Sequence, residues 1–179
     1  MGIIEFIRQS LNQIQERILG SANGLSRDDF LWRPAPHANC IGDIVWHMVR
    51  SEDRLVRVTA GLGPELWVDE QWYSKFGYPK ESPPGNDYQA LNAFSAPPKI
   101  ETLLSYMEAV HKDTIAILSR LSPMDLDRVP HSEQTRLDVG AYLRHLITHK
   151  NNHHGQIDFI RGMTDPNWDL PRGTGMVQR

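Results

Sequence analysis

Three histidines stand close together in the stretch HKNNHHGQ, residues 149–156. On a helix, His149 and His153 would lie about 40° apart around the axis and share one face, because they are four residues apart. Two imidazoles with this spacing can chelate a metal ion, and imidazole suits zinc, nickel, iron and copper. We expect both side chains to point into the core of the helical bundle that is predicted below. His154 is turned about 100° from His153 and is expected to face away from it.

The third ligand of such a site must come from another helix. His47 is the best candidate, because it lies at the edge of an apolar stripe, one turn from Ile44. His111 is the reserve, on the apolar face of a later helix. His145, one turn before His149, is either a further ligand or a polar residue bonded to a neighbour. The alternative for the whole cluster is a set of polar core residues that bind no metal.

Known catalytic motifs with similar residues do not fit. A zincin needs H-E-x-x-H, and Lys150 occupies the position of the glutamate base. The di-iron bundle pattern needs Glu-x-x-His on two helices, which the chain does not have. Neither a glycine-rich phosphate loop nor a G-x-S-x-G elbow occurs. These absences exclude the corresponding mechanisms.

Other polar residues near these positions allow two alternative roles. Glu52 falls on the apolar stripe, where it would either orient a ligand histidine or be a core carboxylate bonded to Arg or Tyr. Gln156 would either bond within the site or support a helix contact, and we favour the second. Cys40 is expected to be buried at a helix start and not to act as a nucleophile. His37 and His131 are expected in exposed loops.

Apolar spacing predicts the elements that position these residues. Four long amphipathic helices are expected, over about residues 3–20, 39–61, 99–121 and 135–162. Asn39 is expected to cap the second, and Thr135 with Asp138 resembles a capping box for the fourth. Short capped turns are expected after Ser26 and Ser122. With almost no strand signal, the chain is predicted to be an all-α four-helix bundle.

Residues 62–98 form a long connection between the second and third helices. They hold six of the twelve prolines and many aromatic side chains. A linker would be poor in aromatics, so we expect a lid-like insertion or pocket wall inside a single domain of residues 1–179. The tail from residue 164 to 179 is expected to be extended and polar.

Composition limits the function classes. The net charge of −3 and the lack of a Lys/Arg run argue against nucleic-acid binding. One cysteine allows no internal disulfide and fits a reducing interior. The N-terminus lacks the pattern of a signal peptide, and no stretch of about 18 apolar residues exists to span a membrane. We therefore expect a cytoplasmic protein.

The chain resembles the DinB/YfiT-like superfamily of metal-binding four-helix bundles over nearly its whole length. The similar stretches are GLSRDDFLWRP, NCIGDIVWHMVRSEDRLV and VGAYLRHLITHKNNHHGQIDFIRG, and the last matches the family's H-x-x-x-H-x-G-Q-I signature. One departure is His154, where the family commonly has Arg.

The resemblance implies a metal triad of His47, His149 and His153. It also implies a divalent ion, often nickel or zinc, and a homodimer. Some members are metal-dependent transferases or isomerases that use low-molecular-weight thiols such as bacillithiol, mycothiol or glutathione, and many have no assigned activity.

Three neutral imidazoles leave the charge of a divalent ion uncompensated, which makes it a strong Lewis acid. Such an ion could activate a thiol or a water molecule. The leading hypothesis is therefore an enzyme that transfers a low-molecular-weight thiol to an electrophilic small molecule, or hydrolyses one. The alternative is a metal-binding bundle or small-molecule binding module without catalysis.

Overall fold

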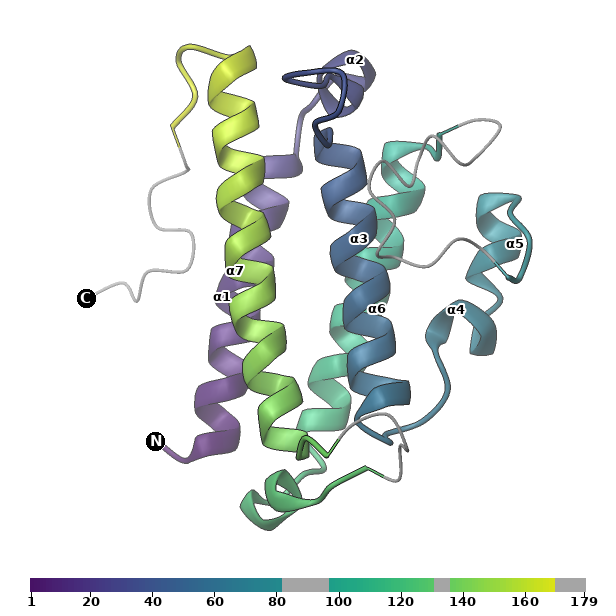
Figure 1. Cartoon of the computed structure of the whole chain (residues 1–179), viewed down its shortest axis with the longest axis vertical. Helices are drawn as coiled ribbons and strands as arrows, with labels where there is room; N and C mark the ends of the chain where they lie inside the picture. Colours follow the sequence, from purple (N-terminus) through teal and green to yellow (C-terminus); the bar gives the residue numbers. More distant parts are fainter. Residues whose placement is uncertain (82–96, 131–135, 170–179) are drawn as a thin grey trace.

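Four long helices run side by side in the computed structural model, which describes residues 1–81, 97–130 and 136–169 (Figure 1). They are α1 (Ile3–Ala22), α3 (Ile41–Asp53), α6 (Ile100–Leu118) and α7 (Val139–Thr164). The part of the chain that the structure describes contains no strand. The predicted all-α four-helix bundle is therefore confirmed.

The long helices bury the apolar positions that spacing predicted. Leu11, Ile14 and Ile18 of α1 are buried, as are Leu146 and Ile157 of α7. Helix α7 packs against both α1 and α3. This double contact decides which of its side chains face the core. Among the described helices, none combines the length and apolarity needed to cross a bilayer.

The helix starts differ in part from the predictions. Ser26 caps α2 (Arg27–Leu31), and Ser122 forms a capping box with Asp125 at the 3₁₀ helix η3 (Pro123–Asp127), both as expected. Asn39 was the wrong cap for α3. Cys40 is the cap, since its Sγ accepts from the Asp43 amide at 3.4 Å while the Asp43 carboxylate accepts from the Cys40 amide at 3.1 Å.

The cap of α7 is Asp138 itself, whose side chain accepts from the Ala141 amide. Thr135, which we expected to be the cap with Asp138 as its capping-box partner, lies outside the described residues. The helix also continues past Gly162 to Thr164. Of the tail, residues 170–179 lie outside the described range.

Helix α3 continues directly into a π-helix, η1 (Arg54–Thr59). The Thr59 hydroxyl donates to the carbonyls of Leu55 and Arg54, at 3.0 and 3.3 Å. π-Helical turns are rare and often occur at functional sites. The widened turn leads the chain out of the bundle toward the long connection.

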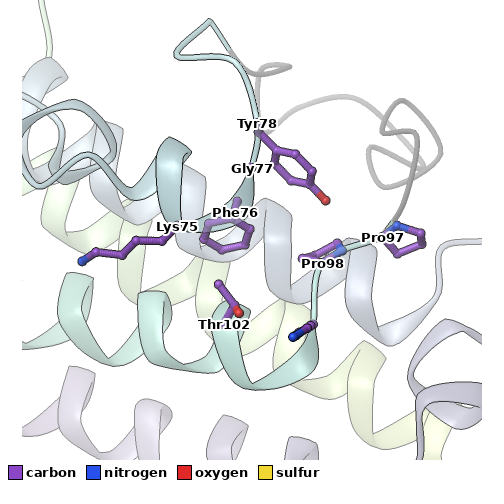
Figure 2. A pocket seen from close by; sticks show the side chains of 8 residues that line it. Lys75, Phe76, Gly77, Tyr78, Pro97, Pro98 and Thr102 are labelled. Atoms are coloured by element: carbon purple, nitrogen blue, oxygen red, sulfur yellow. The ribbon is translucent and has the colours of Figure 1, made fainter.

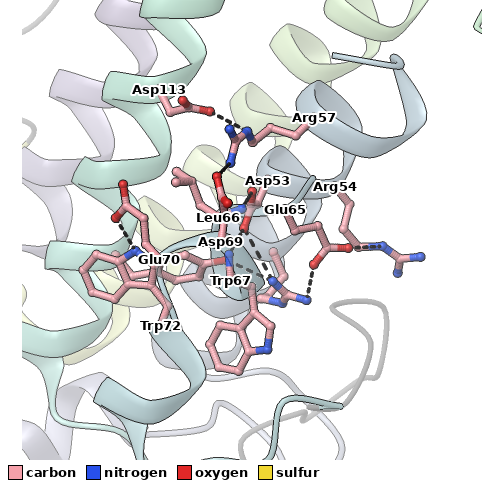
Figure 3. Close-up of polar contacts among 12 residues, drawn as sticks. Asp53, Arg54, Arg57, Glu65, Leu66, Trp67, Asp69, Glu70, Trp72 and Asp113 are labelled. Carbon is pink, nitrogen blue, oxygen red and sulfur yellow. Dashed lines mark hydrogen bonds and ion pairs between the residues drawn. The ribbon is translucent and has the colours of Figure 1, made fainter. Parts of the chain in front are cut away.

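The described part of that connection forms α4 (Leu66–Asp69) and α5 (Trp72–Phe76), which pack on α3 and α6 (Figure 1). The ring of Trp67 lies edge-on to that of Trp46, with 5.5 Å between the ring centroids, and the ring centroids of Trp72 and Tyr106 are 5.1 Å apart. The Asp53 carboxylate accepts from the amides of Leu66 and Trp67, at 2.7 and 2.9 Å (Figure 3). The segment is thus bound to the bundle as a folded part of the core.

A hollow of about 310 Å³ lies between this segment and the start of α6 (Figure 2). Phe76 and Tyr78 line one side, and Pro98 and Thr102 line the other. The rest of the predicted lid, residues 82–96, lies outside the described residues.

Candidate metal centre

Three histidine side chains meet at the seam between α3 and α7. Nε2 of His149 lies 2.9 Å from Nε2 of His47 and 3.2 Å from Nε2 of His153. One ligand atom from each residue lies within 4.8 Å of the others, and all three side chains are half-buried. The structure thus brings together the three residues that the sequence and the resemblance indicated.

The position of these residues on α7 differs from the prediction. The buried face of α7 runs through Leu146, Lys150, His154 and Ile157. His149 and His153 lie beside that face, at the edge of the core, because the buried face is shared between contacts to α1 and α3. The expectation that His154 faces away was wrong, since its side chain is 6% exposed.

The second ring nitrogen of His153 has a partner on its own helix. Its Nδ1 lies 2.8 Å from Oε1 of Gln156. An amide oxygen only accepts, so Nδ1 carries the proton and the lone pair of Nε2 is directed to the cluster. We had favoured a helix contact for Gln156, but the structure shows the other alternative, a hydrogen bond within the site.

The surroundings favour the neutral form of the two cluster histidines on α7. Burial, together with the nearby rings of His153 and His47, lowers the pKa of His149 to about 3. Burial also lowers the pKa of His153, against the opposing effect of Gln156. Neutral imidazoles offer lone pairs at neutral pH, which is the state that metal ligation requires.

The cluster fits a divalent ion. Zinc binds histidine nitrogen at ~2.0–2.1 Å, which separates neighbouring ligand atoms by roughly 2.9–3.4 Å for octahedral to tetrahedral angles. Two of the separations, 2.9 and 3.2 Å, fall in this interval, and all three ligand atoms lie within 4.8 Å of one another. Moreover, a ring whose Nδ1 carries the proton cannot donate from Nε2, so His153 can only accept a hydrogen bond or bind an ion through this atom. One ion would satisfy them together.

Glu52 takes no part in this cluster. Its carboxylate lies 2.5 Å from the Lys150 ammonium, and both side chains are 1% exposed. Burial alone would raise the pKa of Glu52, but Lys150 and His111 lower it to about 2. Glu52 is therefore a core carboxylate, and its partner is Lys rather than the Arg or Tyr that we had considered.

The remaining candidates lie apart from the three ligand atoms. His111 bonds to Asn12 at 2.9 Å. His145 is exposed, with its ring centroid 5.6 Å from that of His149. Cys40 is buried, as expected, and burial next to Asp43 raises its pKa to about 12. His37 is exposed, as expected, and His131 lies outside the described residues.

A pocket of about 280 Å³ opens directly beside the histidines. Its lining consists of His47, Ser51, Arg54, Leu55, Thr59, His145 and His149. None of the described residues of the 62–98 segment contributes, so the expectation of an aromatic wall was wrong for that part of the chain. Sequence analysis missed the true wall, although Ser51, Leu55 and Thr59 follow His47 at four-residue steps and Arg54 precedes Leu55.

A second polar group on α7 looks catalytic but is not arranged for it. His154 Nε2 lies 3.3 Å from the Ser21 hydroxyl and 3.1 Å from the Asp158 carboxylate. In a nucleophilic triad the serine and the acid contact different ring nitrogens, and the serine donates to the histidine. Here the Ser21 hydroxyl donates to Asp158 at 2.5 Å. This group joins α1 to α7 and supplies no nucleophile.

Comparison with known proteins places the chain among helical bundles of this kind. A family model described as the DinB superfamily matches residues 10–157. A crystal structure of a conserved protein from Enterococcus faecalis aligns with a TM-score of 0.76, covering 91% of this chain and 97% of that one at 19% identity. At this identity the structural likeness shows the fold alone. The search of curated proteins gave no match.

Proposed function

We propose, from the premise that this chain belongs to the DinB superfamily, that it is a metal-dependent enzyme acting on an electrophilic small molecule. The nucleophile in this proposal is a low-molecular-weight thiol or water. The observation that supports it is the convergence of His47, His149 and His153 beside an open pocket.

The chain's own residues have distinct tasks in this proposal. The three imidazoles would hold the ion, and Gln156 orients one of them. A divalent ion bound there supplies Lewis acidity, which lowers the pKa of a thiol or water bound to it. The pocket beside His47 and His149 holds the molecule that reacts. Zinc or nickel is the ion we expect.

The rival is a structural ion in a bundle without catalysis. A structural site is usually closed by a fourth protein ligand. Within the described residues the candidate cluster comprises three, since Glu52 pairs with Lys150 and His145 is not among them. The open pocket next to a three-histidine set favours the enzyme. The small-molecule substrate, the homodimer and the cytoplasmic setting stay predictions.

The test is conjugation of thiols to electrophiles by metal-loaded protein. Cellular thiols would be combined with a panel of halides and epoxides, and conjugation should be lost after chelation and in His149→Ala. A panel without metal-dependent conjugation or hydrolysis, with the metal shown to be bound, would favour the rival.

A further inference from the structure

Arg50, Arg54 and Arg57 follow one another at single helical turns along α3 and η1, and they have different partners. Figure 3 shows Arg54 and Arg57 with theirs. Arg50 donates to Tyr106 at 2.9 Å and to Glu65 at 2.7 Å. Its guanidinium also lies 4.7 Å from the ring centre of Trp67. The side chain is 6% exposed, so Arg50 is buried and its guanidinium is paired within the core.

Arg57 is also committed, because it pairs with Asp69 at 3.2 Å and with Asp113 at 3.1 Å. Arg54 is held more weakly. Its one ion pair within the described ranges joins Nε to Glu65 at 3.4 Å, and its side chain is 43% exposed. The Glu65 carboxylate is already engaged by Arg50. An anionic ligand could therefore replace Glu65 as the partner of Arg54 at little cost in free energy.

Arg54 also lines the pocket that contains His47 and His149. The lining includes no acidic residue, and apart from the histidines its other polar side chains are the hydroxyls of Ser51 and Thr59. Arg54 carries the one permanent charge of this lining. Arg54 therefore gives this lining a positive group before any ion binds, with its partner Glu65 outside the lining, and a divalent ion would add to that charge.

We infer that Arg54 is the anion-binding position of this pocket and that the molecule taken there is a small carboxylic acid. Its carboxylate would pair with the guanidinium while its other end lies at the histidine cluster. Guanidinium matches carboxylate with two parallel hydrogen bonds. This inference rests on the proposed function, whose substrate class it specifies.

Size and charge favour a monocarboxylate. The volume of about 280 Å³ is near the lower end for small-molecule sites, which are typically ~300–1,000 Å³. A single arginine balances one negative charge, whereas a phosphate dianion would need more donors than this lining supplies. The carboxylate could belong to the thiol or to the acceptor of the thiol.

The test uses cobalt-loaded protein, whose visible absorption reports ligands at the ion. Binding of 3-mercaptopropionate is compared with binding of its neutral analogue, 3-mercapto-1-propanol. Propionate is compared with 1-propanol in the same way, by absorption and by calorimetry. We expect the acid of at least one pair to bind about tenfold more tightly, the factor that corresponds to ~1.4 kcal/mol.

Variants show which residue causes the preference for the acid over its neutral analogue. Arg54→Ala should abolish it without changing the affinity for the neutral analogue, and Arg54→Lys should retain part of it. The matched control is Arg57→Ala. It removes the same charge from a residue one turn away that does not line the pocket, and it should keep the preference for the acid. A preference for the thiol acid places the carboxylate on the thiol, and one for propionate alone places it on the acceptor.

The inference is overturned if neither acid is preferred, or if Arg57→Ala removes the preference as fully as Arg54→Ala. Failure of the proposed function has a different signature. If cobalt binds but no thiol alters its spectrum, thiol transfer is contradicted, and propionate binding that depends on Arg54 would still support the anion position. If cobalt does not bind, propionate binding to the metal-free protein is measured by calorimetry. Binding that depends on Arg54 would support the anion position, and binding that does not depend on it would overturn the inference.

Discussion

The Nδ1 atom of His153 lies 2.8 Å from Oε1 of Gln156, one turn further along α7. This bond fixes which nitrogen of the ring carries the proton and so directs the other toward His47 and His149. Histidine ligands in proteins usually have such a partner. A glutamine that is exposed, and that the apolar pattern left without a role, therefore belongs to the site.

Replacing Gln156 should weaken the site without destroying it. In Gln156→Ala, we expect the affinity for zinc to fall about 10–100-fold, the usual effect of losing such a partner. Competition with a chromogenic chelator measures this. Asn151→Ala, an exposed amide on the same helix, is the control and should bind like the wild type. Equal affinities for all three proteins would contradict the role given to Gln156.

The buried pair of Glu52 and Lys150 should make stability depend on pH. The pKa of Glu52 is about 2 in the fold, below its ordinary 4.5. Its stabilising contribution is therefore complete above pH ~4.5 and is lost as the pH falls toward ~2. Urea unfolding between these pH values should show a smaller pH dependence in Glu52→Gln than in the wild type. Glu108→Gln, at an exposed position on α6, should keep the wild-type dependence.

Removing only the cation of this pair should be more harmful than removing both charges. Lys150→Met leaves the Glu52 carboxylate buried without its cation, which typically costs about 3–5 kcal/mol. Chemical denaturation at neutral pH measures the change. The double variant with Glu52→Leu should recover most of the loss. A double variant no more stable than Lys150→Met would show that the ion pair is not the cause.

Asp53 should matter for the aromatic segment and not for the metal. In Asp53→Ala, the amides of Leu66 and Trp67 and the Tyr106 hydroxyl lose their acceptor, at about 1–3 kcal/mol for each buried donor left unpaired. Chemical denaturation should show this loss, while zinc affinity stays unchanged. Asp69→Ala removes an exposed partner of Arg57 and should cost less than ~1 kcal/mol. A loss of zinc affinity in Asp53→Ala would contradict the separation of the two regions.

Helical periodicity was sufficient to predict the bundle and the chelating pair, because both depend on residues close in sequence. It could not show which face of α7 is central, since that depends on how α1 and α3 divide the contacts with this helix. His154 was misplaced for this reason, and the burial of Lys150 was not predicted. The partner of Glu52 was missed because it comes from another helix and is a lysine, a residue seldom buried without a partner.

The wall of the pocket was misassigned for a related reason. Aromatic residues in a long connection suggested a lid beside the histidines, yet Trp67 and Trp72 pack on the α3 and α6 side. The positions that line the pocket belong to α3, to its continuation η1 and to α7. Arg54 stands among other arginines in the sequence, and its exposure and weak pairing are visible only in the fold.

The most direct test of the central claim is the metal content of the purified protein. We predict about one divalent ion per chain in the wild type and in His145→Ala, and none in His149→Ala, measured by elemental analysis after exhaustive dialysis. Circular dichroism should show that all three proteins are folded. A wild-type protein that purifies without metal and cannot be loaded, or a His149→Ala protein that retains a full complement, would contradict the assignment of His47, His149 and His153 as a metal centre.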